Sequence, residues 1–133
     1  WQLCPLYAYR DIFYPAGMES IRRAFHVLSD SARYPVLIHC WAGADRTGTL
    51  AFLVNGVLGV ALDDLIHDYE LTSLSRAGLR LHTDQSFQEI LQGLKAYAVK
   101  GDTLQERIRA YLLAAGVSPA ELHSLAEILV EGA

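Results

Sequence analysis

A cysteine and an arginine six residues apart, Cys40 and Arg46, lie on a short loop that contains Gly43. Residues 36–38, before the loop, are β-branched or aliphatic and predict a buried strand. Residues 47–58, after the loop, are almost all apolar and predict a buried helix that Gly59 ends. The order strand, loop, helix therefore places Cys40 at the carboxyl end of a strand and close to a helix N-terminus.

This arrangement suits the binding of an anion and its attack by a thiolate. The N–H groups of the loop and the positive end of the helix would converge on one point. A helix N-terminus and a nearby arginine can lower a cysteine pKa to roughly 3.5–7.5. Arg46 can bind two phosphoryl oxygens at once through its planar guanidinium. Thr47 can donate its hydroxyl to the sulphur of Cys40, and we expect His39 to orient the loop by bonding to its backbone.

The run His39-Cys40, five residues, Arg46-Thr47 resembles the signature loop of the cysteine-dependent protein tyrosine phosphatase superfamily. The finer pattern of residues 42–48, together with residues 68–75 and 111–129, is similar to its bacterial tyrosine and dual-specificity (lipid-type) phosphatase branch. The resemblance implies a metal-independent enzyme without a cofactor, in which Cys40 forms a phosphocysteine intermediate. The phosphate-binding residues that it implies are Trp41, Ala42, Gly43, Ala44, Asp45 and Arg46.

Together with this resemblance, the strand–loop–helix order predicts an α/β fold. We expect a small, mainly parallel sheet flanked by helices, with a helical C-terminal half, and we expect residues 1–133 to form a single phosphatase domain. Residues 3–7 are expected to form a second strand, and the start of the chain inside it, without Met, suggests that further N-terminal strands are missing. Helices are predicted over residues 18–28, 61–74 and 85–98. Capping boxes, at Thr103 with Glu106 and at Ser118 with Glu121, mark the starts of the last two helices.

Ala44 stands where the branch commonly has lysine, which would add positive charge at the mouth of the loop. Its absence disfavours highly phosphorylated lipid or inositol substrates. We therefore expect a phosphorylated protein, attacked at tyrosine or with dual specificity, or a small phosphomonoester. The alternatives are a phosphoinositide or inositol phosphate phosphatase, a catalytically weak phosphate-binding module and an enzyme of the arsenate reductase type.

The superfamily also uses a general acid, usually an aspartate, to protonate the leaving oxygen. Asp11 follows the predicted strand at residues 3–7 and is the first candidate, although a solvated loop residue is the other interpretation. Asp45, inside the loop, could reach the leaving group or activate water in the second step. Asp30 fits better as the cap of a turn before Pro35.

Arginine side chains could add positive charge around the loop. Arg10, Arg22, Arg23 and Arg33 precede it, and one or two of them could line the approach to Cys40, although solvated helix charges are the simpler interpretation of Arg22 and Arg23. Arg80, close to Gly78, is a candidate for substrate contact, with an ordinary loop charge as the alternative.

Charge and cysteine content restrict the partners and the compartment. A net charge of −4 disfavours nucleic acid, and no apolar segment is long enough for stable membrane insertion. Cys4 is expected to be a small apolar core residue, with reversible pairing to Cys40 as the alternative. His67, His82 and His123 lack ligand spacing, so no metal site is expected. We expect a bacterial protein, in the cytoplasm in preference to a secreted one.

Overall fold

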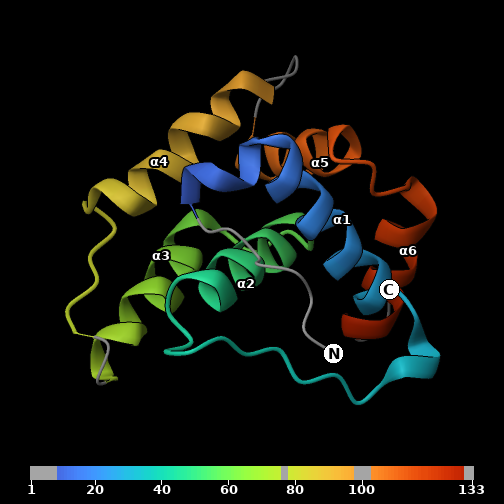
Figure 1. Ribbon diagram of the computed structural model, residues 1–133, viewed down its shortest axis with the longest axis horizontal. Helices are drawn as coiled ribbons and strands as arrows, with labels where there is room; N and C mark the ends of the chain where they lie inside the picture. The colour runs from blue at the N-terminus through green and yellow to red at the C-terminus, as the bar shows by residue number, and fades with distance from the viewer. Residues whose placement is uncertain (1–8, 76–77, 98–102, 131–133) are drawn as a thin grey trace.

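The computed structural model describes residues 9–75, 78–97 and 103–130 of the 133-residue chain. Within these ranges the chain folds into α-helices joined by loops and short 3-10 helices (Figure 1). The α-helices are α1 (Pro15–Leu28), α2 (Arg46–Val57), α3 (Leu62–Leu71), α4 (Gln85–Leu94), α5 (Leu104–Ala114) and α6 (Pro119–Leu129). The 3-10 helices are Tyr9–Phe13, Ser31–Arg33, Thr72–Leu74 and Lys95–Tyr97.

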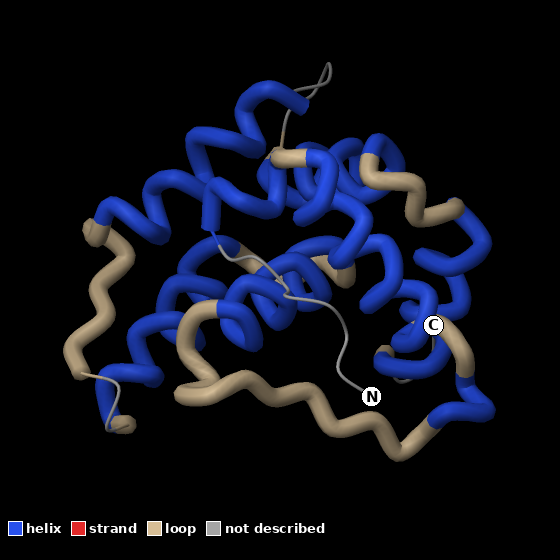
Figure 2. The backbone as a smooth tube through the Cα atoms, in the orientation of Figure 1, coloured by secondary structure: helices blue, strands red, loops and turns tan. Residues whose placement is uncertain are grey.

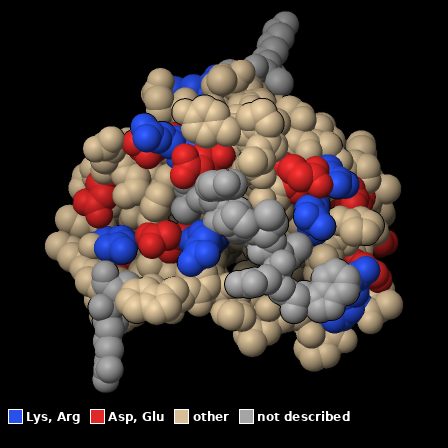
Figure 3. Space-filling view, viewed as in Figure 1, with Lys and Arg blue, Asp and Glu red and all other residues tan. Residues whose placement is uncertain are grey.

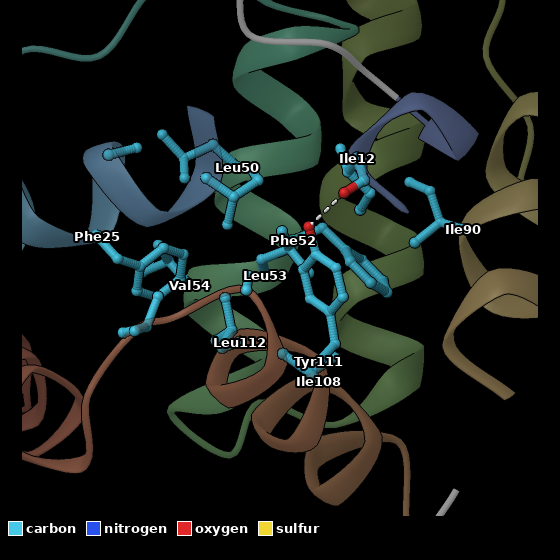
Figure 4. Close-up of a cluster of buried hydrophobic side chains, with 14 of the residues drawn as sticks. Ile12, Phe25, Leu50, Phe52, Leu53, Val54, Ile90, Ile108, Tyr111 and Leu112 are labelled. Atoms are coloured by element: carbon cyan, nitrogen blue, oxygen red, sulfur yellow. Dashed lines mark hydrogen bonds between the residues drawn. The ribbon is translucent and has the colours of Figure 1, made fainter. Parts of the chain in front are cut away.

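Helix α2 is the helix that the almost entirely apolar residues 47–58 predict after the loop, and it lies among the other helices, packed against α3 and α5 (Figure 1). Its buried residues include Leu50, Phe52, Leu53 and Val54, which lie on more than one side of the helix (Figure 4). A helix that is apolar on most sides is stable only when other elements cover it. The Cys40–Arg46 loop therefore leads directly into a helix held by the hydrophobic core.

The segment Tyr9–Phe13 is attached to the same core. Ile12 is fully buried, and its carbonyl accepts a hydrogen bond of 2.8 Å from the Tyr111 hydroxyl on α5 (Figure 4). The rings of Phe13 and Tyr111 meet edge to face with their centroids 5.3 Å apart. A buried carbonyl without a partner costs about 1–3 kcal/mol, so this hydrogen bond helps to hold Tyr9–Phe13 in place.

Gly17 on α1 permits the close approach of the Tyr9–Phe13 segment. A Cβ atom at this position would lie 2.1 Å from the backbone oxygen of Asp11 and 2.8 Å from Ile12 Cα. We expect Gly17→Ala to lower the free energy of unfolding by about 1–3 kcal/mol, because backbone atoms must move to relieve the overlap. Urea denaturation followed by circular dichroism measures this loss.

Gly48→Ala is the matched control, because a Cβ atom there meets no atom closer than 3.9 Å. It is expected to leave the free energy of unfolding unchanged or slightly raised. Equal stability of the Gly17→Ala variant and the wild type would contradict the close contact with Asp11.

The predicted helices are confirmed, with shifted boundaries. Helix α1 begins at Pro15, three residues before the predicted start; α3 ends at Leu71, and the 3-10 helix Thr72–Leu74 completes the range predicted to residue 74. Helix α4 ends at Leu94, before the predicted end at residue 98, which lies outside the described residues. Both capping boxes are confirmed, with Thr103 and Ser118 accepting from the N–H groups of Glu106 and Glu121.

The predicted small, mainly parallel sheet is wrong for the described residues, which contain no strand (Figure 2). Residues 36–39 run as a loop without ladder partners, and Leu37 is 86% exposed where burial was expected. A strand is stable only when neighbouring backbone satisfies its N–H and C=O groups. The second predicted strand, residues 3–7, lies outside the described residues, as does Cys4.

Among the described residues, no helix combines the length and the apolar character needed to cross a membrane.

Candidate active site

Cys40 lies immediately before a loop whose N–H groups turn toward its sulphur. The Gly43 N–H donates to Cys40 Sγ at 3.2 Å. Gly43 has a φ of +78°, a left-handed conformation that side chains with a Cβ atom rarely adopt. The glycine is therefore needed for the turn that directs this N–H group at the thiol.

The surroundings of Cys40 make it a stronger nucleophile than an ordinary thiol. Partial burial of the thiol raises its pKa, but hydrogen bonds from the Thr47 hydroxyl and from the N–H groups of Thr47, Gly43 and Ala42 lower it, with a net change from 9.0 to about 7. The Thr47 hydroxyl is buried and has no partner in full hydrogen-bonding geometry within the described residues, so its interaction with the Cys40 sulphur is a weak one. The lowered pKa favours the thiolate at neutral pH, and the N–H groups that stabilise the thiolate are also donors for a bound anion.

Alkylation of Cys40 should report this lowered pKa directly. The rate of reaction with iodoacetamide is expected to rise with pH through a midpoint of about 7, since only the thiolate reacts. Mass spectrometry of the peptide that contains Cys40 measures the rate at each pH. Inorganic phosphate should slow the reaction. A midpoint near the ordinary value of 9.0 would contradict the loop geometry.

The start of α2 leaves its backbone donors available. Asp45 precedes the helix, and its side chain does not cap the helix N–H groups. The first N–H groups of a helix have no partner inside the helix and bind anions readily. A phosphate beside Cys40 would therefore meet both the loop N–H groups and the positive end of α2.

Arg46 lies on the same open hollow as the thiol. The hollow has a volume of about 1170 Å³, and Cys40, Arg46, Thr47 and Trp41 are among its lining residues. Arg46 is exposed and forms no ion pair with any other described residue. Its guanidinium is thus available to a dianionic ligand.

The other predicted loop residues differ in their exposure to solvent. His39 Nδ1 lies 3.4 Å from the carbonyl oxygen of Cys40, and Trp41 is 93% exposed at the rim of the hollow. Ala44 is only 2% exposed. Ala44 therefore adds no charge to the hollow and is not among the residues that line it.

The carboxylate candidates occupy different surroundings. Asp30 caps the 3-10 helix Ser31–Arg33, as its sequence context suggested, by accepting from the Ala32 N–H at 3.1 Å. Asp11 lies in Tyr9–Phe13, and neither Asp11 nor Asp45 is among the residues that line the hollow at Cys40. Asp45 is the only one of these candidates inside the loop.

Asp45 has two partners that sequence reasoning did not connect with it. The Tyr9 hydroxyl donates to Asp45 Oδ1, and Arg80 Nη2 lies 3.6 Å from the same oxygen. Arg80 thus pairs with a loop carboxylate, and its contact with a substrate stays a prediction. Tyr9 gave no signal in the sequence beyond its place near Asp11, since nothing local relates it to a residue 36 positions later.

Charged residues around the hollow are partly neutralised. Arg22 and Arg33, both on its lining, pair with Glu19 at 2.8 Å and with Asp30 at 3.0 Å. On the face in Figure 3, Lys and Arg side chains are interspersed with Asp and Glu side chains. The described residues contain no cluster of His, Cys, Asp and Glu that could hold a metal ion.

Comparison with known proteins gives one family. The sequence model of a family described as "Tyrosine phosphatase family" matches residues 6–131. No solved structure matches the chain significantly.

Individual relatives match parts of the chain. "Inositol diphosphatase DSP4" of Arabidopsis thaliana is 36% identical over 72 residues, which are 54% of this chain and 35% of the relative. "Triple specificity protein phosphatase PtpB" of Mycobacterium tuberculosis is 37% identical over 70 residues, 51% of this chain and 25% of the relative. "Receptor-type tyrosine-protein phosphatase epsilon" of Rattus norvegicus is 31% identical over 99 residues, 68% of this chain and 13% of the relative. The chain thus spans about a third or less of the length of these relatives.

Proposed function

Because the chain belongs to the tyrosine phosphatase family, we propose that it hydrolyses phosphate monoesters through a phosphocysteine intermediate on Cys40. The observation that carries this proposal is the Cys40 thiol with a pKa of about 7, held by loop N–H groups at the start of α2. A thiolate, a set of backbone donors and an arginine on one hollow are what a phosphoryl-transfer site of this kind requires.

The reaction takes two steps. In the first, the Cys40 thiolate attacks phosphorus; the S–P bond forms, the ester P–O bond breaks, and the leaving oxygen takes a proton from an aspartate. Arg46 and the loop N–H groups hold the phosphoryl oxygens as charge redistributes. In the second step, water attacks the same phosphorus, the P–S bond breaks, and inorganic phosphate and the thiolate are released.

Phosphotyrosine, alone or with dual specificity, is the substrate that we propose first. The buried Ala44 supplies no cation at the mouth of the loop, whereas a highly phosphorylated ligand would need several. An inositol phosphate is the second candidate, because one relative is named an inositol diphosphatase.

Hydrolysis of four substrates in the presence of EDTA tests the proposal: p-nitrophenyl phosphate, a phosphotyrosine peptide, the same peptide with phosphoserine, and an inositol polyphosphate. We expect metal-independent turnover, inhibition by vanadate, the largest kcat/KM for the phosphotyrosine peptide, and a phosphate adduct on Cys40 after rapid quenching. A larger kcat/KM for the inositol polyphosphate would support the second candidate. Vanadate binding without hydrolysis of any of the four would instead indicate a phosphate-binding module.

A further inference from the structure

Tyr9, Asp45 and Arg80 form a cluster beside the Cys40–Arg46 loop, although they come from three separate parts of the chain. The Tyr9 hydroxyl and the Arg80 guanidinium both contact Oδ1 of Asp45, and Oδ2 takes part in neither contact. One carboxylate oxygen is therefore held in place, and these contacts leave Oδ2 without either partner. Asp45 directly precedes Arg46, which lines the hollow at Cys40. The Asp45 side chain is partly exposed, at 44%, so water can reach it.

Tyr9 is hydrogen-bonded to the start of α2 through its side-chain hydroxyl and through its backbone N–H. Its N–H donates to Thr49 Oγ1 at 3.5 Å, and Thr49 Oγ1 donates to the carbonyl oxygen of Asp45 at 2.7 Å. Thr49 is 2% exposed. Tyr9 also has a φ of +56°, an uncommon conformation for a residue with a side chain, which persists only where surrounding contacts hold it. Tyr9 therefore has little freedom to release the Asp45 carboxylate.

The tyrosine hydroxyl also keeps its proton. Burial, followed by the hydrogen bond to Asp45, raises the pKa of Tyr9 above its ordinary range. The hydroxyl thus remains a donor to Asp45 throughout the pH range in which Cys40 becomes a thiolate.

Arg80 is presented to Asp45 by an anchored loop. The Arg80 N–H donates to Ser73 Oγ at 2.8 Å, and Ser73 Oγ donates to the Arg80 carbonyl at 3.0 Å. Two residues later, the His82 N–H donates to Glu70 Oε1 at 3.0 Å. The backbone around Arg80 is thereby attached to the end of α3 and to the turn that follows it.

We propose that Tyr9 and Arg80 are positioning residues that hold Asp45 so that its second carboxylate oxygen activates the water of the dephosphorylation step. This inference rests on the proposed function. In the step, the water oxygen bonds to phosphorus, the P–S bond to Cys40 breaks, the water proton passes to Asp45 Oδ2, and the electron pair of the broken bond returns to the sulphur. The role differs from that of Arg46, which would contact the phosphoryl oxygens themselves.

Rapid-quench and steady-state kinetics with p-nitrophenyl phosphate separate the two steps. Nitrophenolate leaves without needing a proton, so kcat/KM reports the attack by Cys40, and kcat reports dephosphorylation when that step is slow. For Tyr9→Phe, Arg80→Ala and Asp45→Asn we expect kcat to fall about 10- to 100-fold, a share of the ~10²–10⁴ that a general base contributes. We expect kcat/KM to stay within about twofold, and the phosphate adduct on Cys40 to accumulate. Arg80→Lys should recover part of the lost kcat, because it retains the charge.

Two matched controls remove the same kinds of group from residues outside the cluster of Tyr9, Asp45 and Arg80. Tyr14→Phe removes a hydroxyl from a tyrosine that is 59% exposed, and Arg109→Ala removes an exposed arginine from a separate hollow that Pro119 and Leu122 line. Both are expected to leave kcat and the adduct level unchanged.

A double-variant cycle tests whether Tyr9 acts through Asp45. If it does, Tyr9→Phe in the Asp45→Asn background lowers kcat no further. A fall of kcat/KM together with kcat, weaker vanadate binding, or additive losses in the double variant would overturn the positioning role and indicate a general disturbance of the loop. Circular dichroism identifies any variant that fails to fold. If Arg80→Ala fails to fold, Arg80→Lys tests the role of Arg80 in its place.

A different result would contradict the proposed function. In that case the wild type itself forms no Cys40 adduct and does not turn over, and the dephosphorylation role of Asp45 is overturned with it. An active wild type whose variants show none of the expected changes overturns the positioning role alone.

Discussion

Replacing Cys40 by serine is expected to lower the hydrolysis of p-nitrophenyl phosphate by on the order of 10³-fold or more, because the covalent step loses its nucleophile. The loop N–H groups that lower the Cys40 pKa to about 7 cannot make a serine hydroxyl comparably ionised at neutral pH. The side chain lies outside the hydrophobic core, so the variant should fold like the wild type and still bind vanadate. Steady-state rates and vanadate titration together measure the two properties.

Cys4→Ser is the matched control, because it makes the same chemical change at the other cysteine of the chain. We expect it to leave kcat unchanged in reducing buffer. Substantial activity of Cys40→Ser would contradict the phosphocysteine mechanism, whereas equal losses in both cysteine variants would indicate that the two thiols act together.

Replacing Arg46 by lysine is expected to lower kcat/KM by about 10²–10³-fold, the range seen when one donor to a developing oxyanion is removed. Lysine retains the positive charge but lacks the planar fork that binds two phosphoryl oxygens at once. Arg46 forms no ion pair with a described residue, so the loss would reflect the bound phosphoryl group and not a broken internal contact. Kinetics with p-nitrophenyl phosphate and a phosphotyrosine peptide measure the effect.

Arg109→Lys provides the comparison at an exposed arginine away from the loop and should leave kcat/KM unchanged. A loss of less than about threefold in Arg46→Lys would show that charge alone suffices, and would contradict bidentate binding by Arg46.

Local spacing predicted the helices more reliably than the sheet. The capping boxes at Thr103 and Ser118 involve residues three positions apart, and their hydrogen bonds form within one helical turn whatever the rest of the chain does. The sheet prediction failed because a strand needs a partner from elsewhere in the chain. The apolar character of residues 36–38 predicts an extended backbone, but it carries no information about which segment lies beside it.

In the candidate site, too, the contacts within the loop could be predicted from the sequence, whereas the contacts between distant segments could not. Cys40, Gly43 and Thr47 lie within eight consecutive residues, so the hydrogen bonds that lower the Cys40 pKa follow from the path of one loop into one helix. Tyr9 and Arg80 reach Asp45 only after α1, α2 and the turn after α3 have packed. No spacing rule relates a tyrosine to an aspartate 36 positions later.

The sequence by itself determined the family and the residues that form the loop, because both depend on residues that are neighbours along the chain. Only the tertiary structure decided that residues 36–39 run without a strand partner among the described residues, that Asp11 is not among the residues lining the hollow at Cys40, and that Tyr9 and Arg80 contact Asp45. These features depend on contacts between distant segments. Such contacts form when burial of apolar residues brings the helices together, and the residues that meet there carry no mark of it in their local sequence.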